Sequence, residues 1–82
     1  MLNQIKKSLI LSGHKTSVAL EEDFWTALDS IAKNKNTSVD SIIQKIDKYE
    51  RKGSLASALR VFILNFFIEM KKWWIIVGKN SK

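Results

Sequence analysis

One six-residue stretch, Lys15–Leu20, constrains the fold of this 82-residue chain more than any other feature. Apolar or β-branched residues alternate there with polar or smaller ones, which predicts a half-buried β-strand. The stretch runs directly into an acidic helix start, Glu21–Asp23. No comparable strand follows it, and a lone strand leaves its backbone N–H and C=O groups unpaired. We therefore predict that the strand pairs antiparallel with the same strand of a second copy, about a two-fold axis.

Such a two-stranded ribbon has two different faces. One face buries Thr16, Val18 and Leu20 against the helices. The other presents Lys15, Ser17 and Ala19, once from each copy. Because a two-stranded ribbon fits the DNA major groove, the outward face is a candidate DNA-reading surface.

Composition narrows the chemistry. The chain has no cysteine and a single histidine, so disulfides and a zinc site are not expected, and no cofactor is predicted. A domain this small often needs oligomerisation for stability, which agrees with the ribbon. The net charge of +6 favours a polyanionic partner, double-stranded DNA first and an anionic membrane second. We expect a cytoplasmic protein, with which the lack of cysteine is compatible.

Three segments follow from the pattern. Residues 1–13 are interpreted as a basic N-terminal arm, with a short strand over Ser8–Ser12 and a bend at Gly13 as the alternative. Residues 14–53 hold the strand, a helix from about Glu22 to Lys33, and a second helix that ends at Gly53. Residues 54–82 form a C-terminal helix capped by Ser54, followed by a basic tail.

The C-terminal helix is apolar around most of its circumference, and such a helix must be buried on several sides. An 82-residue monomer offers too little cover, which implies an inter-subunit interface in a homodimer and leaves a tetramer open. The residues predicted for the dimer interface are Thr16, Val18, Leu20, Ile42, Ile46, Phe62 and Phe66.

The order of strand, helix, short turn and helix resembles the ribbon-helix-helix DNA-binding proteins, the superfamily of Arc and the methionine repressor. The match looks closer to a little-characterised bacterial branch with a third helix. The residues that carry it are Gly13–Ser17, Leu20–Glu21, Phe24–Trp25 and Ser57–Phe62. The fold class expected is mainly α: one short N-terminal strand paired in an intertwined dimer, plus a long apolar C-terminal helix.

The resemblance implies roles for particular residues. Lys15, Ser17 and Ala19 would face the groove, and Thr37, Ser38 and Val39 would hold a phosphate through N–H groups at a helix start, which is a favourable place for an anion. Ala19 departs from the usual pattern because it offers no hydrogen-bonding group. Basic arm residues track phosphates, so the predicted DNA-binding set is completed by Lys6, Lys7 and His14.

No catalytic motif is present, and we interpret the chain as a non-enzyme that regulates transcription, as a repressor. One alternative is an antitoxin that represses its own operon and docks a partner protein through residues 55–77. Another is a membrane-surface protein anchored by residues 71–77, because charged residues interrupt any full span. Arg60 is expected to pair with an acidic residue of the first helix or of the dimer mate.

Overall fold

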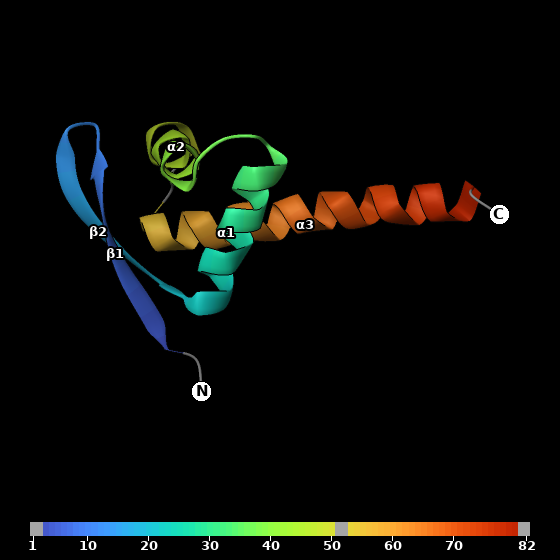
Figure 1. Ribbon diagram of the computed structural model, residues 1–82, viewed down its shortest axis with the longest axis horizontal. Coiled ribbons are helices and arrows are strands. Elements are labelled where there is room, and N and C mark those ends of the chain that lie inside the picture. Colours follow the sequence, from blue (N-terminus) through green and yellow to red (C-terminus); the bar gives the residue numbers. More distant parts are fainter. Residues whose placement is uncertain (1–2, 51–52, 81–82) are drawn as a thin grey trace.

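The computed structural model describes residues 3–50 and 53–80, and of residue 50 and residues 72–80 the backbone alone. In this part of the chain a two-stranded sheet is followed by helices (Figure 1). The elements are β1 (Gln4–Leu11), β2 (His14–Glu21), α1 (Glu22–Asn34), α2 (Val39–Lys45), one turn of π-helix, η1 (Ile46–Glu50), and α3 (Leu55–Asn80). The mainly α fold with a long C-terminal helix is confirmed.

The sheet is an antiparallel hairpin made within one chain. Its turn consists of Ser12 and Gly13, both left-handed, with φ of 50° and 80°. Positive φ at both central residues is the type I′ geometry, whose twist matches that of the paired strands. The register runs from Leu11 opposite His14 to Gln4 opposite Glu21.

The prediction that Lys15–Leu20 is a lone strand, paired only with the same strand of a second copy, is corrected by this hairpin. Residues 4–11 are not an arm: they form β1, and β1 supplies the backbone partners that β2 needs. The alternative of a short strand with a bend at Gly13 is confirmed, and that strand is longer than Ser8–Ser12.

The core lies between the inner face of the hairpin and the three helices. Leu9, Leu11, Val18 and Leu20 are the buried residues of the hairpin. The helices add the rest of the buried apolar side chains: Trp25, Leu28, Ile31, Ala32, Ile42, Ile43, Ile46, Leu55, Leu59 and Ile63. These residues form one cluster, so a single chain builds a continuous core.

This core changes the meaning of several predicted interface residues. Val18, Leu20, Ile42 and Ile46 were predicted to lie between two copies, yet each is buried by its own chain. The chain's own core thus covers these four residues without a second copy, and their place in a dimer interface stays a prediction. Thr16, Phe62 and Phe66 are only half-buried and keep surface that a partner can contact.

Helix ends follow the local sequence signals. Ser38 caps α2, because its Oγ accepts the amide N–H of Ser41 at 3.1 Å. Ser54 caps α3 in the same way through the amide of Ser57, at 3.1 Å. Asn36 adopts a left-handed φ of 56° in the turn after α1, as expected for an asparagine at a helix end. The predicted cap at Ser54 is confirmed.

Helix α3 extends well beyond the body of the molecule (Figure 1). It runs to Asn80, so the predicted basic tail begins later than residue 79. No helix in the described part of the chain is both long enough and apolar enough to cross a membrane. The side chains of residues 72–77, which carry much of the membrane-surface alternative, lie outside the described residues.

The hairpin register predicts where a disulfide will form. Flanking residues of a two-residue turn are a hydrogen-bonded pair, so Ser8 and Ser17 form a non-hydrogen-bonded pair with Cα atoms about 4.5 Å apart. In the double variant Ser8→Cys/Ser17→Cys we expect an intrachain disulfide on mild oxidation of dilute protein. Mass spectrometry of the unreduced protein measures it.

The matched control is Ser8→Cys/Thr16→Cys, whose side chains lie on opposite faces of the ribbon. It should remain reduced under the same conditions. Failure of the Ser8–Ser17 pair to close within one chain would contradict the hairpin and return residues 4–11 to an arm.

Candidate nucleic-acid interface

The hairpin has a polar face opposite its buried one, and part of this face, at Ser17 and Ala19, borders a hollow shared with the first turns of α3. Directly paired residues share a face of an antiparallel ribbon. The pairs that alternate with the buried ones are Gln4 with Glu21, Lys6 with Ala19, Ser8 with Ser17, and Ile10 with Lys15, and the last three form what we call the outer face. All residues of the outer face are exposed except Ala19, which is half-buried. The structure thus brings together Lys15, Ser17 and Ala19, as the sequence suggested, and adds Lys6 from the other strand.

Two outer-face residues, Ser8 and Ile10, were missed by sequence reasoning because they were placed in an arm. Ser8 adds a hydroxyl opposite that of Ser17, and Ile10 exposes 68% of its surface beside Lys15. The signal was available in the Ser12-Gly13 pair, since a glycine after a small polar residue between apolar runs indicates a hairpin turn.

Lys7 and His14 do not join the outer face. Lys7 is opposite the buried Val18, and its Nζ lies 4.8 Å from the centre of the Trp25 ring, a cation–π contact. Trp25 in turn donates its Nε1–H to the Ile5 carbonyl oxygen at 2.9 Å, which ties α1 to β1. His14 is opposite the buried Leu11 and is exposed at the tip of the hairpin. The register therefore places both residues on the side of the ribbon that faces the helices.

The start of α2 only partly fits the predicted phosphate site. The amide of Thr37 already donates to the Ala32 carbonyl oxygen at 2.9 Å, so Thr37 is removed from that role. The hydroxyl of Ser38 already accepts a hydrogen bond as the helix cap. The amides of Ser38 and Val39 lie at the helix start, where the helix itself supplies no acceptor for their N–H groups. The hollow beside Val39 is lined by three carboxylates, those of Glu22, Asp29 and Asp40, and by Lys7. An anion there meets repulsion as well as N–H donors.

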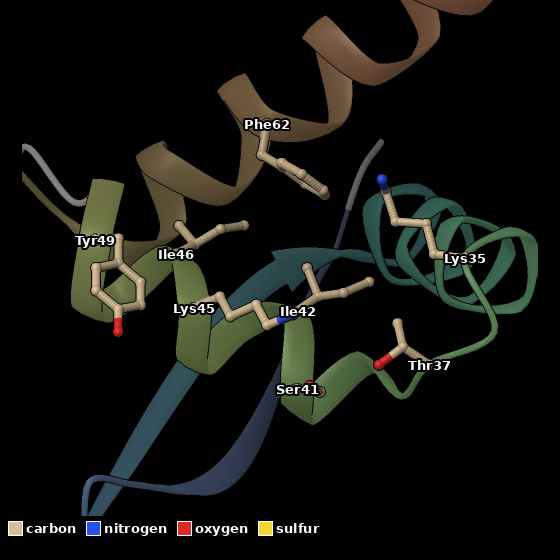
Figure 2. Close-up of a pocket in the computed structure, with 8 residues that line it drawn as sticks. All are labelled: Lys35, Thr37, Ser41, Ile42, Lys45, Ile46, Tyr49 and Phe62. Atoms are coloured by element: carbon tan, nitrogen blue, oxygen red, sulfur yellow. The ribbon is translucent and has the colours of Figure 1, made fainter.

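A second hollow, of about 560 Å³, opens on the other side of α2 and has the opposite charge (Figure 2). Its polar lining comes from Lys35, Lys45 and the hydroxyls of Thr37 and Ser41, without a carboxylate. Its apolar lining comes from Ile42, Ile46, Tyr49 and Phe62. The basic side of α2 is therefore this one, and sequence reasoning assigned neither lysine to a site.

Glu21 joins the open end of the hairpin to α3. Its Oε1 accepts from Nη2 and Nε of Arg60 at 3.0 and 3.2 Å, and its Oε2 accepts from Nε2 of Gln4 at 3.2 Å. The guanidinium also lies over the Phe24 ring, at 5.6 Å. Arg60 thus pairs with an acid at the entry to α1, as expected. Glu21 is the one carboxylate of residues 3–21, so pairing it leaves the hairpin's free charge positive.

Hydrogen bonds to the Glu21 carboxylate lower its pKa below the ordinary value. The donors are its own backbone amide, the Gln4 side chain and the Arg60 guanidinium. Among the described residues there is no cluster of His, Cys, Asp and Glu that would hold a metal ion. The outer face itself offers lysine charge, hydroxyl groups and apolar side chains.

Comparison with known families agrees with this arrangement. The sequence profile of the ribbon-helix-helix domain matches residues 4–67, which include both strands and the first half of α3. The chain belongs to the ribbon-helix-helix family. The fold of this family is a DNA-binding fold, and it implies dimerisation in general.

One solved structure similar to this ribbon-helix-helix chain is that of an uncharacterized protein from Bordetella pertussis Tohama I. The TM-score is 0.73 and the sequence identity 28%, over 85% of this chain. The match spans 60% of the Bordetella protein, so this chain corresponds to part of it. The comparison with curated proteins finds no match.

The lowered pKa of Glu21 predicts how stability depends on pH. A carboxyl whose pKa is lower in the folded state stabilises the fold above its unfolded pKa, near 4.3, and loses that contribution as the pH falls through the folded value. The unfolding midpoint in urea should therefore drop below about pH 4.3. Glu21→Gln should lose stability at neutral pH and show a smaller further loss in acid.

The control is Glu22→Gln, the next residue, which is exposed at the start of α1. The unfolding midpoint of Glu22→Gln in urea should change with pH in the same way as that of the wild-type protein. If Glu21→Gln and wild type differ by the same amount at pH 7 and in acid, the carboxylate of Glu21 does not stabilise the fold through its charge.

Proposed function

We propose that this chain is a dimeric bacterial transcriptional regulator, a cytoplasmic repressor, that places the outer face of its hairpin in the DNA major groove. The observation that carries the proposal is the composition of that face within a DNA-binding fold. It holds two lysines, two hydroxyls and two apolar side chains, and the one carboxylate on the same side of the hairpin, that of Glu21, is paired with Arg60. A polyanion is the partner that such a surface favours.

The outer-face residues match the chemistry of base edges in the major groove. Lys15 can donate to the O6 and N7 atoms of guanine, and the hydroxyls of Ser8 and Ser17 donate or accept. Ala19 and Ile10 can contact the methyl group of thymine. With few hydrogen-bonding groups on the face, phosphate contacts supply most of the affinity and base contacts a smaller part.

Dimerisation is proposed through the edge of β2 that faces away from β1. In this register Thr16 and Val18 exchange backbone hydrogen bonds with β1, so Lys15, Ser17 and Ala19 direct their N–H and C=O groups to the other edge. A second β2, antiparallel about a two-fold axis, would satisfy them. This pairing would place two sets of Lys15, Ser17 and Ala19 side chains, one set from each copy, next to each other on the same face of the sheet.

The width of the combined sheet assigns a role to β1. Four strands at about 4.8 Å spacing place the two β1 strands about 14 Å apart. The major groove is about 12 Å wide, so β2 and its copy would lie inside the groove and each β1 at an edge, beside the phosphates. Lys6, on β1, is then a phosphate contact, whereas Lys15 and Ser17 are groove contacts.

DNA binding should depend on the outer face. We expect Lys15→Ala/Ser17→Ala to weaken binding to duplex from upstream of the protein's own gene at least tenfold. Lys6→Ala should reduce the slope of log affinity against log salt by about 1.8, because the dimer loses two phosphate contacts. Fluorescence anisotropy at several salt concentrations, with random duplex as competitor, measures both effects.

The matched control is Ser30→Ala/Lys33→Ala, which removes the same two side-chain types from exposed positions of α1. Its affinity should stay near that of wild type. Equal losses in the two double variants would mean that the charge acts generically, and the outer face would no longer be the DNA-binding surface.

The dimer should depend on the free edge of β2. A proline at position 19 removes an amide that β1 does not use, and proline is tolerated at edge strands. We expect Ala19→Pro to halve the mass in analytical ultracentrifugation, whereas Ala19→Val, which keeps the amide, should not. The Ser8–Ser17 disulfide, introduced into the same variant, checks that the hairpin survives. An unchanged mass with an intact hairpin would rule out pairing through this edge.

The antitoxin alternative requires a partner protein on the apolar surface of α3. That surface is exposed in the chain, which is the observation in its favour. A surface for self-association is covered in the purified protein alone, whereas a surface for a partner protein stays open until that partner is supplied. The mass of α3 variants therefore distinguishes the two.

A further inference from the structure

Helix α3 has a second apolar stripe on the side away from the core. Leu55, Leu59 and Ile63 are buried and mark the inner side of the helix. Val61, Leu64 and Ile68 form what we call the distal stripe, and they expose 56%, 59% and 45% of their surface. At 3.6 residues per turn, the two stripes are centred roughly 170° apart. The helix therefore has a core-facing side and a separate apolar side.

The spacing of the distal stripe is that of a helix-pairing seam. Intervals of three and four residues, from Val61 to Leu64 and from Leu64 to Ile68, are the a, d and a positions of a heptad. A surface that only kept α3 soluble would carry polar residues at these three positions.

We propose that the distal stripe pairs with the same stripe of a second copy, so that two α3 helices form a short two-helix seam. Because the stripe lies opposite the core, the two molecular bodies would lie on opposite sides of the seam and would not collide. The extension of α3 beyond the body also leaves this part of the helix accessible (Figure 1). Neither hairpin takes part.

Charge selects the orientation of the pair. Lys71, exposed, occupies the next d position after Ile68. In a parallel pair the two Lys71 ammonium groups would face each other across the seam, which is unfavourable. An antiparallel pair centred near residue 66 places Leu64 against Ile68 of the other copy. Lys71 then lies beside Val61 of the other copy, with its aliphatic stem over the valine and its charge in water.

Phe67 strengthens this arrangement. It flanks the seam near the centre, exposes 41% of its surface and packs edge-to-face on Phe66, with the ring centres 5.3 Å apart. In the antiparallel pair Phe67 of each copy lies close to the two-fold axis. Leu64, Phe67 and Ile68 from two copies would then form a compact apolar cluster, and no acidic residue occupies the a and d positions from Val61 to Lys71.

Leu64→Lys tests the seam. It places a charge at the centre of the pair, and it lies outside the core, so folding should be retained. We expect it to halve the mass measured by sedimentation equilibrium. The control is Asn65→Lys, the adjacent exposed position, which carries the same new charge at the margin where charged residues are common in paired helices. It should keep the wild-type mass.

The outcome is independent of the β2 edge. If both interfaces form, Leu64→Lys and Ala19→Pro each halve the mass, and the two together give a monomer. Halving by Leu64→Lys supports the seam whatever Ala19→Pro does, and DNA binding to a single site should persist. If Leu64→Lys has the same mass as the wild-type protein, the proposal is overturned. It is also overturned if the distal stripe becomes covered only when a different protein is added, which is the outcome that the antitoxin alternative predicts.

Cysteines test the orientation, since the chain has none of its own. In the antiparallel pair, Leu64→Cys chains mixed with Ile68→Cys chains should form a mixed disulfide on oxidation. Leu64→Cys alone should form much less, because residue 64 does not face itself. Abundant disulfide between two Leu64→Cys chains would instead show a parallel pair and overturn the antiparallel assignment.

Discussion

The two-residue turn at Ser12 and Gly13 is the constraint on which the rest of the molecule depends. Its left-handed residues fix the register of β1 against β2, and a shift by one residue would move every side chain of a strand to the other face. The register decides that Val18 and Leu20 enter the core while Lys15 and Ser17 point away. It also decides which backbone groups of β2 remain available to a second copy. Core, outer face and free edge are thus consequences of one turn.

A two-stranded hairpin is marginal in water on its own, so the helices must hold it. Apolar burial does most of this, and two directed contacts position the ribbon. The Trp25 indole binds the Ile5 carbonyl, and Glu21 binds Arg60 of α3. The ion pair with Arg60 also neutralises the carboxylate of Glu21, which is the one negative charge of the hairpin. The interaction that positions the ribbon therefore helps to make its outer face suitable for a polyanion.

Local signals in the sequence were sufficient for the helices. Ser38 and Ser54 cap helices because their hydroxyls reach the amides three residues on, and Asn36 adopts the conformation that ends α1. The hairpin was harder to predict because Lys7 occupies a position on the helix side, where alternation requires an apolar residue. Its ammonium group is accommodated by the Trp25 ring, a contact that exists only after folding. The outward strand residues were predictable from β2, and their partners on β1 were not.

Periodicity also could not say which molecule buries an apolar side chain. Ile42 and Ile46 lie on a clear apolar stripe, but the stripe is equally compatible with cover from α3 and with cover from a second copy. The structure separates the two cases: residues on the inner side of α3 meet the chain's own core, and those of the distal stripe do not. Association through the excess apolar surface of α3 stays a prediction, and the residues available for it are those that the chain's own core leaves exposed.

The proposed contacts divide the surface of the chain without overlap. The free edge of β2 would contact one copy, the distal stripe of α3 would contact another copy, and the outer face of the hairpin would bind DNA. Because the α3 seam lies outside the hairpin, two dimers joined through it would carry two independent DNA-reading surfaces. Each dimer contributes few hydrogen-bonding groups, so occupying two sites at once would raise the apparent affinity through effective concentration without adding contacts at either site. A weakly specific reading head is therefore compatible with selective regulation when the operator supplies two sites at a spacing that the α3 pair can bridge.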